Sequence, residues 1–229
     1  MNIKENVDEI IEKVAAACER SERELDEVTI MTVTKYVSPE RVDKAIEAGV
    51  EHFGESRSEG LLAKREAIQT PVYWHFIGRL QSRKVKEVVH NCDVIHSLDR
   101  LSLAKEINKR YQREKPMSCM VQVNVSGEET KAGVSPEELE EFVRSLQSYE
   151  HIQVSGLMTM APHVDDPEEV RPYFKKMRAL RDKIQTLNLS HAPCHHLSMG
   201  MSNDYVQAVE EGATIIRLGT SIVGSEMVD

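Results

Sequence analysis

Lys35 is the first residue whose position suggests chemistry. It closes the apolar, β-rich run 28–34, and a second such run, 213–216, leads directly into Arg217-Leu218-Gly219-Thr220. A lysine amine can bind an aldehyde covalently as a Schiff base, and the backbone N–H groups of a Gly/Thr/Ser turn can hold a phosphate. A lysine at the exit of the first strand, facing a small-residue turn at the exit of the last, therefore predicts a site for pyridoxal 5′-phosphate (PLP).

A second small-residue turn is predicted at the exit of the seventh strand. Here Ser198 can offer a hydroxyl, Gly200 lets the backbone approach a ligand closely, and Ser202 is a candidate cap for the next helix. Barrels often bind phosphate between the ends of strands seven and eight. We therefore expect the turns after both strands to contact one phosphate.

Arg217 is the most diagnostic side chain after Lys35. An arginine only donates hydrogen bonds, so beside the pyridine nitrogen of PLP it leaves that nitrogen unprotonated. This pairing weakens the ring as an electron sink. The alternative is that Arg217 pairs with a carboxylate at the end of the barrel. Met160 could cover one face of a flat ring, and His75, which alternates with apolar neighbours, is expected to be a hydrogen-bonded histidine of the barrel.

Short β-rich runs alternate with stretches of helical periodicity along the chain. The predicted strands are 28–34, 50–53, 73–78, 93–97, 118–125, 152–158, 194–198 and 213–217. The predicted helices are 3–24, 39–48, 58–68, 82–90, 100–113, 136–148, 167–187 and 203–211. This order predicts an α/β fold, a single (β/α)8 TIM-type barrel domain over 1–229, with an extra N-terminal helix that covers the open position in the outer ring. An open doubly wound sheet is the alternative.

Composition and charge exclude several classes of function. The formal net charge of −9 argues against a general role in binding nucleic acid or a lipid surface. No apolar run approaches the ~20 residues that span a bilayer, and the N-terminus lacks the apolar core of a signal peptide. Four cysteines without close pairing indicate a reducing compartment, so we expect a cytoplasmic protein.

A metal site is not expected. His191, Cys194, His195 and His196 lie close together in the sequence, but adjacent residues of a strand point to opposite faces. No second pair of ligands at the required spacing completes a zinc site.

Several motifs in order along nearly the whole chain carry a family resemblance. They are Thr34-Lys35, His52-Phe53-Gly54-Glu55, Trp74-His75-Phe76-Ile77-Gly78-Arg79-Leu80-Gln81, Val123-Asn124, Gly156-Leu157-Met158-Thr159-Met160, Leu197-Ser198-Met199-Gly200-Met201-Ser202 and Ile216-Arg217-Leu218-Gly219-Thr220. Together they resemble the pyridoxal phosphate homeostasis protein family, single-domain relatives of the barrel domain of alanine racemase.

The resemblance implies a PLP Schiff base on Lys35 and a contact of Arg217 with the pyridine nitrogen. It also implies phosphate contacts from three residues, with Met199 alongside: Ser198, Gly219 and Thr220. Similarity to alanine racemase places Met160 where that enzyme has a ring-stacking histidine. One departure is Ser56, where the family commonly has asparagine, so a contact made by that amide cannot be carried over.

Three functions are compatible with such a site. The favoured one is a monomeric, non-enzymatic PLP carrier or buffer that maintains the vitamin B6 pool, and indirectly amino-acid homeostasis, with PLP-dependent apoenzymes as candidate partners. The main alternative is a PLP-dependent amino-acid racemase. The third is an aldolase-like barrel enzyme acting on a phosphorylated metabolite, in which Glu55 would be the carboxylate near Lys35.

A racemase needs acid/base groups on opposite faces of the cofactor. Lys35 can be one of them. Alanine racemases take the other, a tyrosine, from an added domain, for which we expect no room because the sequence ends at Asp229. Nothing in the sequence places Tyr36, Tyr73 or Tyr205 on the opposite face, so we expect at most trace racemase activity.

Overall fold

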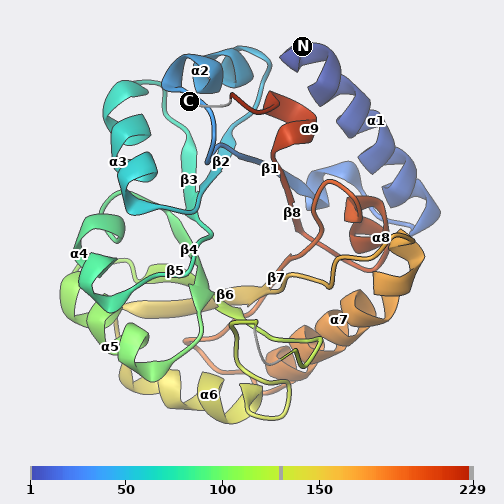
Figure 1. The fold of residues 1–229 in the computed structure, drawn as a ribbon. Coiled ribbons are helices and arrows are strands. Elements are labelled where there is room, and N and C mark those ends of the chain that lie inside the picture. Colours follow the sequence, from blue (N-terminus) through green and yellow to red (C-terminus); the bar gives the residue numbers. More distant parts are fainter. Residues whose placement is uncertain (1, 129–130, 227–229) are drawn as a thin grey trace.

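The strands of the computed structural model, which describes residues 2–128 and 131–226, form a closed parallel barrel in the order β1 to β8 (Figure 1). Their bounds are β1 (Thr29–Val33), β2 (His52–Glu55), β3 (Tyr73–Phe76), β4 (Val94–Leu98), β5 (Met117–Gln122), β6 (Ile152–Met158), β7 (His196–Ser198) and β8 (Ile215–Leu218). Because β1 pairs in parallel with β8 as well as with β2, the predicted barrel is confirmed and the open sheet is wrong.

Helices surround the barrel. Their bounds are α1 (Ile3–Arg20), α2 (Pro39–Glu47), α3 (Ser58–Ala67), α4 (Val85–Val88), α5 (Leu101–Arg110), α6 (Leu139–Ser145), α7 (Arg171–Thr186), α8 (Tyr205–Glu210) and α9 (Thr220–Val223). Most coincide with predicted helices but are shorter, since several first or last turns are 3-10 turns or irregular. The single turn α9, which directly follows β8, was not predicted.

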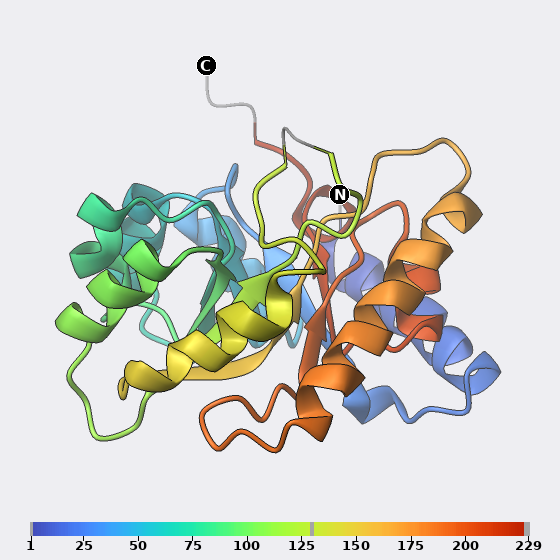
Figure 2. The ribbon, with the colours of Figure 1, turned by 90° about the horizontal axis from the view of Figure 1, so that it is seen from below.

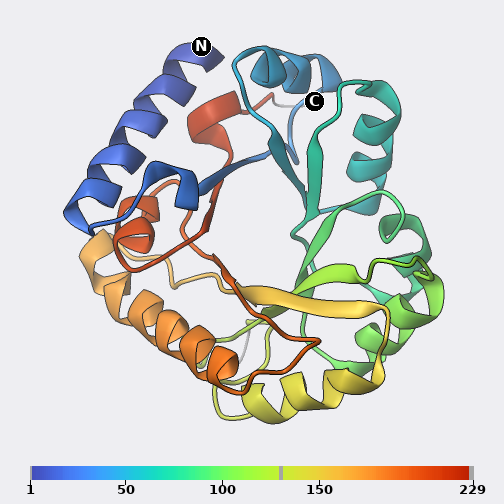
Figure 3. The same cartoon turned by 180° about the vertical axis from the view of Figure 1, so that it is seen from behind.

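The N-terminal helix α1 completes the outer ring beside α8 and α9 (Figures 1 and 3). Its inner face buries Val7, Ile10, Val14 and Cys18, which recur at the spacing of one helical stripe. Ile11, also part of the predicted stripe, lies at its edge and is exposed. The expected role of this helix is confirmed, because α9 is too short to cover β8 and β1 by itself.

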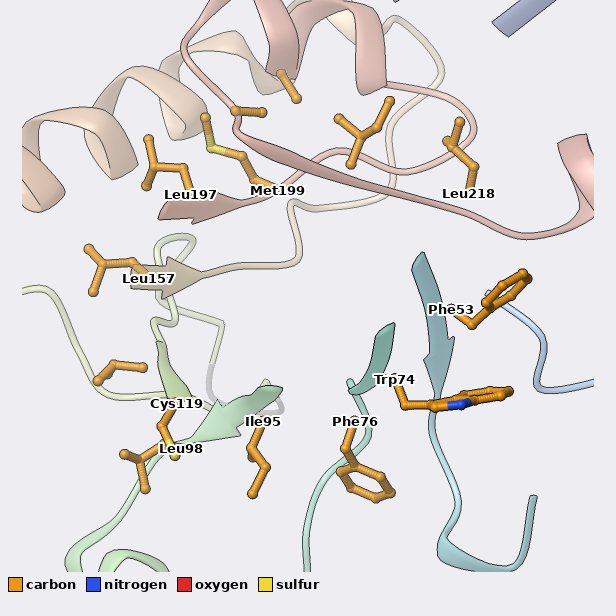
Figure 4. Packing of buried hydrophobic residues seen from close by; sticks show 14 of the residues in the cluster. Phe53, Trp74, Phe76, Ile95, Leu98, Cys119, Leu157, Leu197, Met199 and Leu218 are labelled. Carbon is orange, nitrogen blue, oxygen red and sulfur yellow. The ribbon is translucent and has the colours of Figure 1, made fainter. Parts of the chain in front are cut away.

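Alternation along the strands separates two apolar regions. Outward-facing side chains, among them Phe53, Trp74 and Leu157, pack in the main core between barrel and helices (Figure 4). Inside the barrel there is a smaller apolar cluster, made of Met31, Met120, Met158 and Ile215. Successive residues of a strand point to opposite faces, so the positions flanking the outward residues are left to line the interior.

All strands of the barrel end at the same side because they are parallel. Figure 2 shows the molecule from the side, with the segment after β5 at one end and the segment before β7 at the other. Residues that follow the strands are thereby gathered at the C-terminal end of the barrel, where enzymes of this architecture carry their active sites.

Candidate functional site

The predicted cofactor residues meet at the C-terminal end of the barrel. Lys35 comes two residues after β1, and Met160 two residues after β6. The others lie at the ends of β7 and β8: Ser198, Met199, Arg217, Gly219 and Thr220. Strands β7, β8 and β1 are consecutive neighbours in the barrel, so the lysine and the two small-residue turns share one sector of this end.

Lys35 has an exposed side chain. Its Nζ lies 4.9 Å from the centroid of the Tyr36 ring. A Cβ added to Gly219 would lie 3.4 Å from the carbonyl oxygen of Val33. The turn after β8 therefore lies directly against the end of β1, as the sequence predicts, and the lysine amine is accessible to a ligand.

Arg217 is buried, with 5% of its surface exposed. Its Nη1 donates to the Ser198 hydroxyl at 2.9 Å and its Nη2 donates to the Thr159 carbonyl at 2.8 Å. Burial lowers its pKa to about 10, which leaves the guanidinium charged at neutral pH. Both acceptors are neutral, and no ion pair of the described residues includes Arg217. The alternative that this arginine pairs with a carboxylate is therefore wrong.

Ser198 is completely buried. Its hydroxyl accepts from Arg217 and also lies 3.0 Å from Nδ1 of His96. This hydroxyl is thus part of a hydrogen-bond network in the barrel interior. Its contact with a phosphate stays a prediction, and such a contact would add a third partner to the oxygen.

The turns after β7 and β8 are joined by their serines, since the hydroxyl oxygens of Ser202 and Ser221 lie 3.2 Å apart. The expectation that Ser202 caps the next helix is wrong. Asp204 is the N-cap of α8, and its Oδ1 accepts from the Met201 N–H. The serine is instead turned toward the neighbouring turn.

Backbone N–H groups are available in the turn after β8. Gly219 precedes the single turn α9, and within the described part of the chain residues 219–221 donate no backbone hydrogen bond. Their N–H groups are those that a helix start leaves without partners. They are suited to bind an anion that approaches this end of the barrel.

Two residues of the turn after β7 have roles in packing. A Cβ on Gly200, whose φ is +94°, would lie 2.6 Å from the Ala208 Cβ. The glycine therefore permits close packing against α8, and not only the approach of a ligand. The Met199 side chain is fully buried in the main core (Figure 4), and its N–H donates to the Ile215 carbonyl at 3.1 Å. Any contact of Met199 with a cofactor would have to come from its backbone.

Met160 has 42% of its surface exposed, which leaves it accessible at the mouth of the barrel.

The loop after β5 is organised by Asn124, whose Nδ2 donates to the Glu128 carbonyl at 2.8 Å and whose Oδ1 accepts from the Gly127 N–H. Residues 129 and 130 of this loop lie outside the described residues.

Glu55 does not approach Lys35. Its carboxylate is buried toward α3, where its Oε1 lies 2.6 Å from the Lys64 Nζ and accepts from the Thr34 hydroxyl at 2.7 Å. The outward orientation follows from alternation along β2, because Gly54 faces the interior and contacts Met31. The carboxylate required by the aldolase-like hypothesis is therefore engaged elsewhere.

Three histidines inside the barrel are linked to this site. His52 Nδ1 lies 3.0 Å from His75 Nε2, and His75 Nδ1 lies 2.9 Å from His96 Nε2. The expectation that His75 is hydrogen-bonded within the barrel is confirmed. His52 and His96 were not candidates, although each occupies an inward position on a strand next to β3. Alternation on these strands was the signal that could have found them.

Among residues 2–128 and 131–226, no cluster of histidine, cysteine or carboxylate side chains is arranged to hold a metal ion. The same residues contain no helix that is both long and apolar enough to cross a membrane.

Comparison with known proteins shows the family. The family model described as "Alanine racemase, N-terminal domain" matches residues 6–227. A relative from Aquifex aeolicus (strain VF5), named pyridoxal phosphate homeostasis protein, is 43% identical over 226 residues, which cover 98% of each chain. The chain belongs to the pyridoxal phosphate homeostasis protein family. The resemblance expected from its motifs is thereby confirmed.

Two solved structures have the same barrel fold as this member of the pyridoxal phosphate homeostasis protein family. The crystal structure described as that of an unknown protein from Bifidobacterium adolescentis has a TM-score of 0.90 and 33% identity, and the match covers 96% of this chain and 94% of that one. PipY from Synechococcus elongatus PCC7942, solved with PLP bound, has a TM-score of 0.80 and 30% identity, with 94% of this chain and 100% of PipY covered.

Proposed function

We propose that this protein binds PLP at the C-terminal end of its barrel and carries or buffers it. It thereby maintains intracellular vitamin B6 and, indirectly, amino-acid homeostasis without robust catalysis. The observation that carries this proposal is the buried guanidinium of Arg217, which donates only to neutral acceptors and interacts with the Asp204 carboxylate without a direct ion pair. A buried charge without a directly bonded counter-ion is costly, and a ligand that brings an acceptor and a phosphate to this end offsets that cost. The name of the Aquifex aeolicus relative and the PLP bound to PipY support it.

The residues present fit this cofactor. Lys35 would supply the amine that binds the aldehyde, and Arg217 would donate to the pyridine nitrogen. The turns after β7 and β8 would hold the phosphate through Ser198, Gly219 and Thr220, with the Met199 backbone alongside. Met160 would lie beside the ring. When bound, PLP supplies an electron sink, and an arginine at the pyridine nitrogen keeps that sink weak.

The positions of two tyrosines argue against a racemase. Tyr73 begins β3 at the opposite end of the barrel, where it stacks on His52 with ring centroids 4.6 Å apart. Tyr205 is buried on α8, with Lys13 and Glu9 of α1 as charged neighbours. Neither can act on the far face of a ligand bound to Lys35. Tyr36, the third tyrosine considered, directly follows Lys35 in the chain, and nothing places it on the face opposite the lysine.

The proposal extends to the setting of the protein. The cysteines of the described chain are free, which supports a reducing compartment, and we propose the cytoplasm. We further propose that residues 1–229 act as one PLP-binding domain, that the protein is a monomer, and that PLP-dependent apoenzymes receive the cofactor.

The visible absorption spectrum of the purified protein tests this function. A band that borohydride reduction attaches covalently to Lys35, and that Lys35→Ala abolishes, is the expected result. Lys176→Ala is the control, since this exposed lysine lies on α7 in the outer ring. A protein that stays colourless with added PLP would refute the cofactor. Alanine racemisation with turnover comparable to ordinary enzymes would refute the carrier and support the racemase.

A further inference from the structure

A continuous line of hydrogen bonds crosses the barrel from the candidate site to the N-terminal ends of the strands. Each contact is between 2.9 and 3.0 Å. This line, here called the histidine relay, consists of Arg217, Ser198, His96, His75 and His52. Its first four members are buried, with exposed fractions from 0% to 5%. His52 is half-buried and has an open ring nitrogen, Nε2, for which the described residues provide no partner.

The direction of the relay is set at the arginine. A guanidinium can only donate, so the Ser198 oxygen must accept from it. The serine hydrogen then has one available acceptor in the described structure, Nδ1 of His96. It follows that His96 carries its hydrogen on Nε2 and donates to His75, which in turn donates from Nε2 to His52. All three imidazoles share one tautomer.

The opposite direction is less favourable without a ligand. If His96 donated to Ser198, the serine hydrogen would be left in a completely buried position without an acceptor. A buried donor without a partner is destabilising. An acceptor oxygen placed beside Ser198 removes this penalty, because the hydroxyl can then donate to it while receiving hydrogen bonds from both Arg217 and His96.

We propose that a phosphate bound beside Ser198 reverses the histidine relay, so that occupancy of the site changes the tautomer of His52 at the other end of the barrel. This inference rests on the proposed function, because the phosphate is that of PLP. It goes beyond that function in giving the inward histidines a role in reporting the bound state.

The protons balance in this reversal. One proton enters at Ser198 from water, because a phosphate monoester, whose second pKa is about 6, is mostly a dianion at neutral pH and accepts a hydrogen bond from the serine. The serine hydrogen moves to His96 Nδ1, the His96 Nε2 hydrogen to His75 Nδ1, and the His75 Nε2 hydrogen to His52 Nδ1. The Nε2 hydrogen of His52 leaves to water. Each imidazole remains neutral, with its hydrogen on Nδ1.

The surroundings keep the inner relay neutral. Burial lowers the pKa of His75 to about 3 and holds the pKa of His96 well below its usual value. Apart from its own members, the charged and titratable groups that act on the relay are Glu51, Asp93, Tyr73, His196 and Asp204. Glu51 and Asp93 oppose the lowering of the pKa of His52, which burial causes.

Nitrogen-15 NMR of the histidine rings tests the relay directly. His75→Gln and His96→Gln assign the signals. In the ligand-free protein, we expect both rings with the hydrogen on Nε2. Saturation with PLP should move it to Nδ1 in both, and inorganic phosphate should have the same effect if it occupies the site. A different tautomer in the ligand-free protein would overturn the inferred direction.

A variant separates this proposal from the proposed function. His75→Leu interrupts the histidine relay away from the residues assigned to bind PLP, so PLP should still attach to Lys35 while the tautomer of His52, assigned with His52→Gln, no longer responds. Ser118→Ala removes a barrel hydroxyl outside the relay, which bonds to Ser155 at 2.8 Å, and should leave the response intact. If PLP attaches to Lys35 in the unmodified protein and the tautomers do not change, the reversal of the relay is refuted and the proposed function is not. If neither PLP nor phosphate binds, both proposals are refuted.

Discussion

The hydroxyl oxygens of Ser202 and Ser221 lie 3.2 Å apart and connect the turn after β7 to the turn after β8. These turns are separated by α8 in the sequence and adjacent in the barrel. Each hydroxyl can hold the other in place or donate to an anion between the turns. The pair therefore marks where the two predicted halves of a phosphate site meet.

The first prediction concerns this pair. Ser221→Ala should weaken PLP binding by about tenfold, because a hydrogen bond to a charged group contributes about 1.5 kcal/mol. Binding of pyridoxal, which lacks the phosphate, should not change. Equilibrium dialysis with both vitamers measures the difference, with the exposed Ser148→Ala as control. Equal losses for the two vitamers would contradict a phosphate role for this turn.

Replacing Arg217 should have opposite effects on the free and bound protein. Arg217→Gln removes a buried charge that forms no direct ion pair and interacts with Asp204 only at longer range, so the ligand-free protein should lose little stability or gain some. The increase in thermal stability that PLP causes should be smaller in the variant, because a neutral amide replaces the charged donor to the ring nitrogen. Thermal unfolding with and without PLP separates the two effects. A large loss in the free protein with an unchanged PLP effect would show that the arginine is purely structural.

The buried ion pair of Glu55 and Lys64 predicts a stability effect without a change in cofactor chemistry. Lys64→Met leaves the Glu55 carboxylate buried with only the Thr34 hydroxyl, and should cost roughly 3–5 kcal/mol. The double variant Glu55→Leu/Lys64→Met should recover part of this loss. Chemical denaturation measures both variants. If the double variant is less stable than Lys64→Met, the loss in the single variant does not come from an unpaired Glu55 carboxylate.

His75 predicts a dependence of stability on pH. Its pKa is lowered by burial to about 3 in the folded protein, whereas in the unfolded chain it is near 6.5. Between these values the unfolded state binds the extra proton, so folding stability falls as the pH decreases from 6.5 toward 3. One such proton contributes about 1.4 kcal/mol per pH unit.

Comparison of His75→Gln with the unmodified protein isolates this contribution from that of the carboxylates. The variant should lose stability less steeply below pH 6.5, by about one proton's slope. His195→Gln, at an exposed position, should retain the steep slope. Parallel curves for His75→Gln and the unmodified protein would mean that His75 takes up a proton in the folded state.

The sequence by itself was sufficient for the architecture and for the end of the barrel that carries the site. Eight β-rich runs alternating with helical periodicity predict the closed barrel, because parallel strands require crossovers. The same order puts Lys35 and Arg217 at strand exits, and parallel strands bring their exits together. A stripe along the first helix was enough to predict that it belongs to the outer ring.

Only the tertiary structure decided which partner each polar side chain takes. Ser202 is near enough to α8 to cap it, yet its hydroxyl faces Ser221, because β7 and β8 pair side by side in the barrel and bring their turns together. Glu55 faces α3 because the residues of β2 alternate, which removes it from Lys35. His52 and His96 are far apart in sequence and join one line of hydrogen bonds because β2 and β4 flank β3, which carries His75. Local periodicity determines the direction in which a side chain points, whereas its partner depends on elements that the chain brings together after folding.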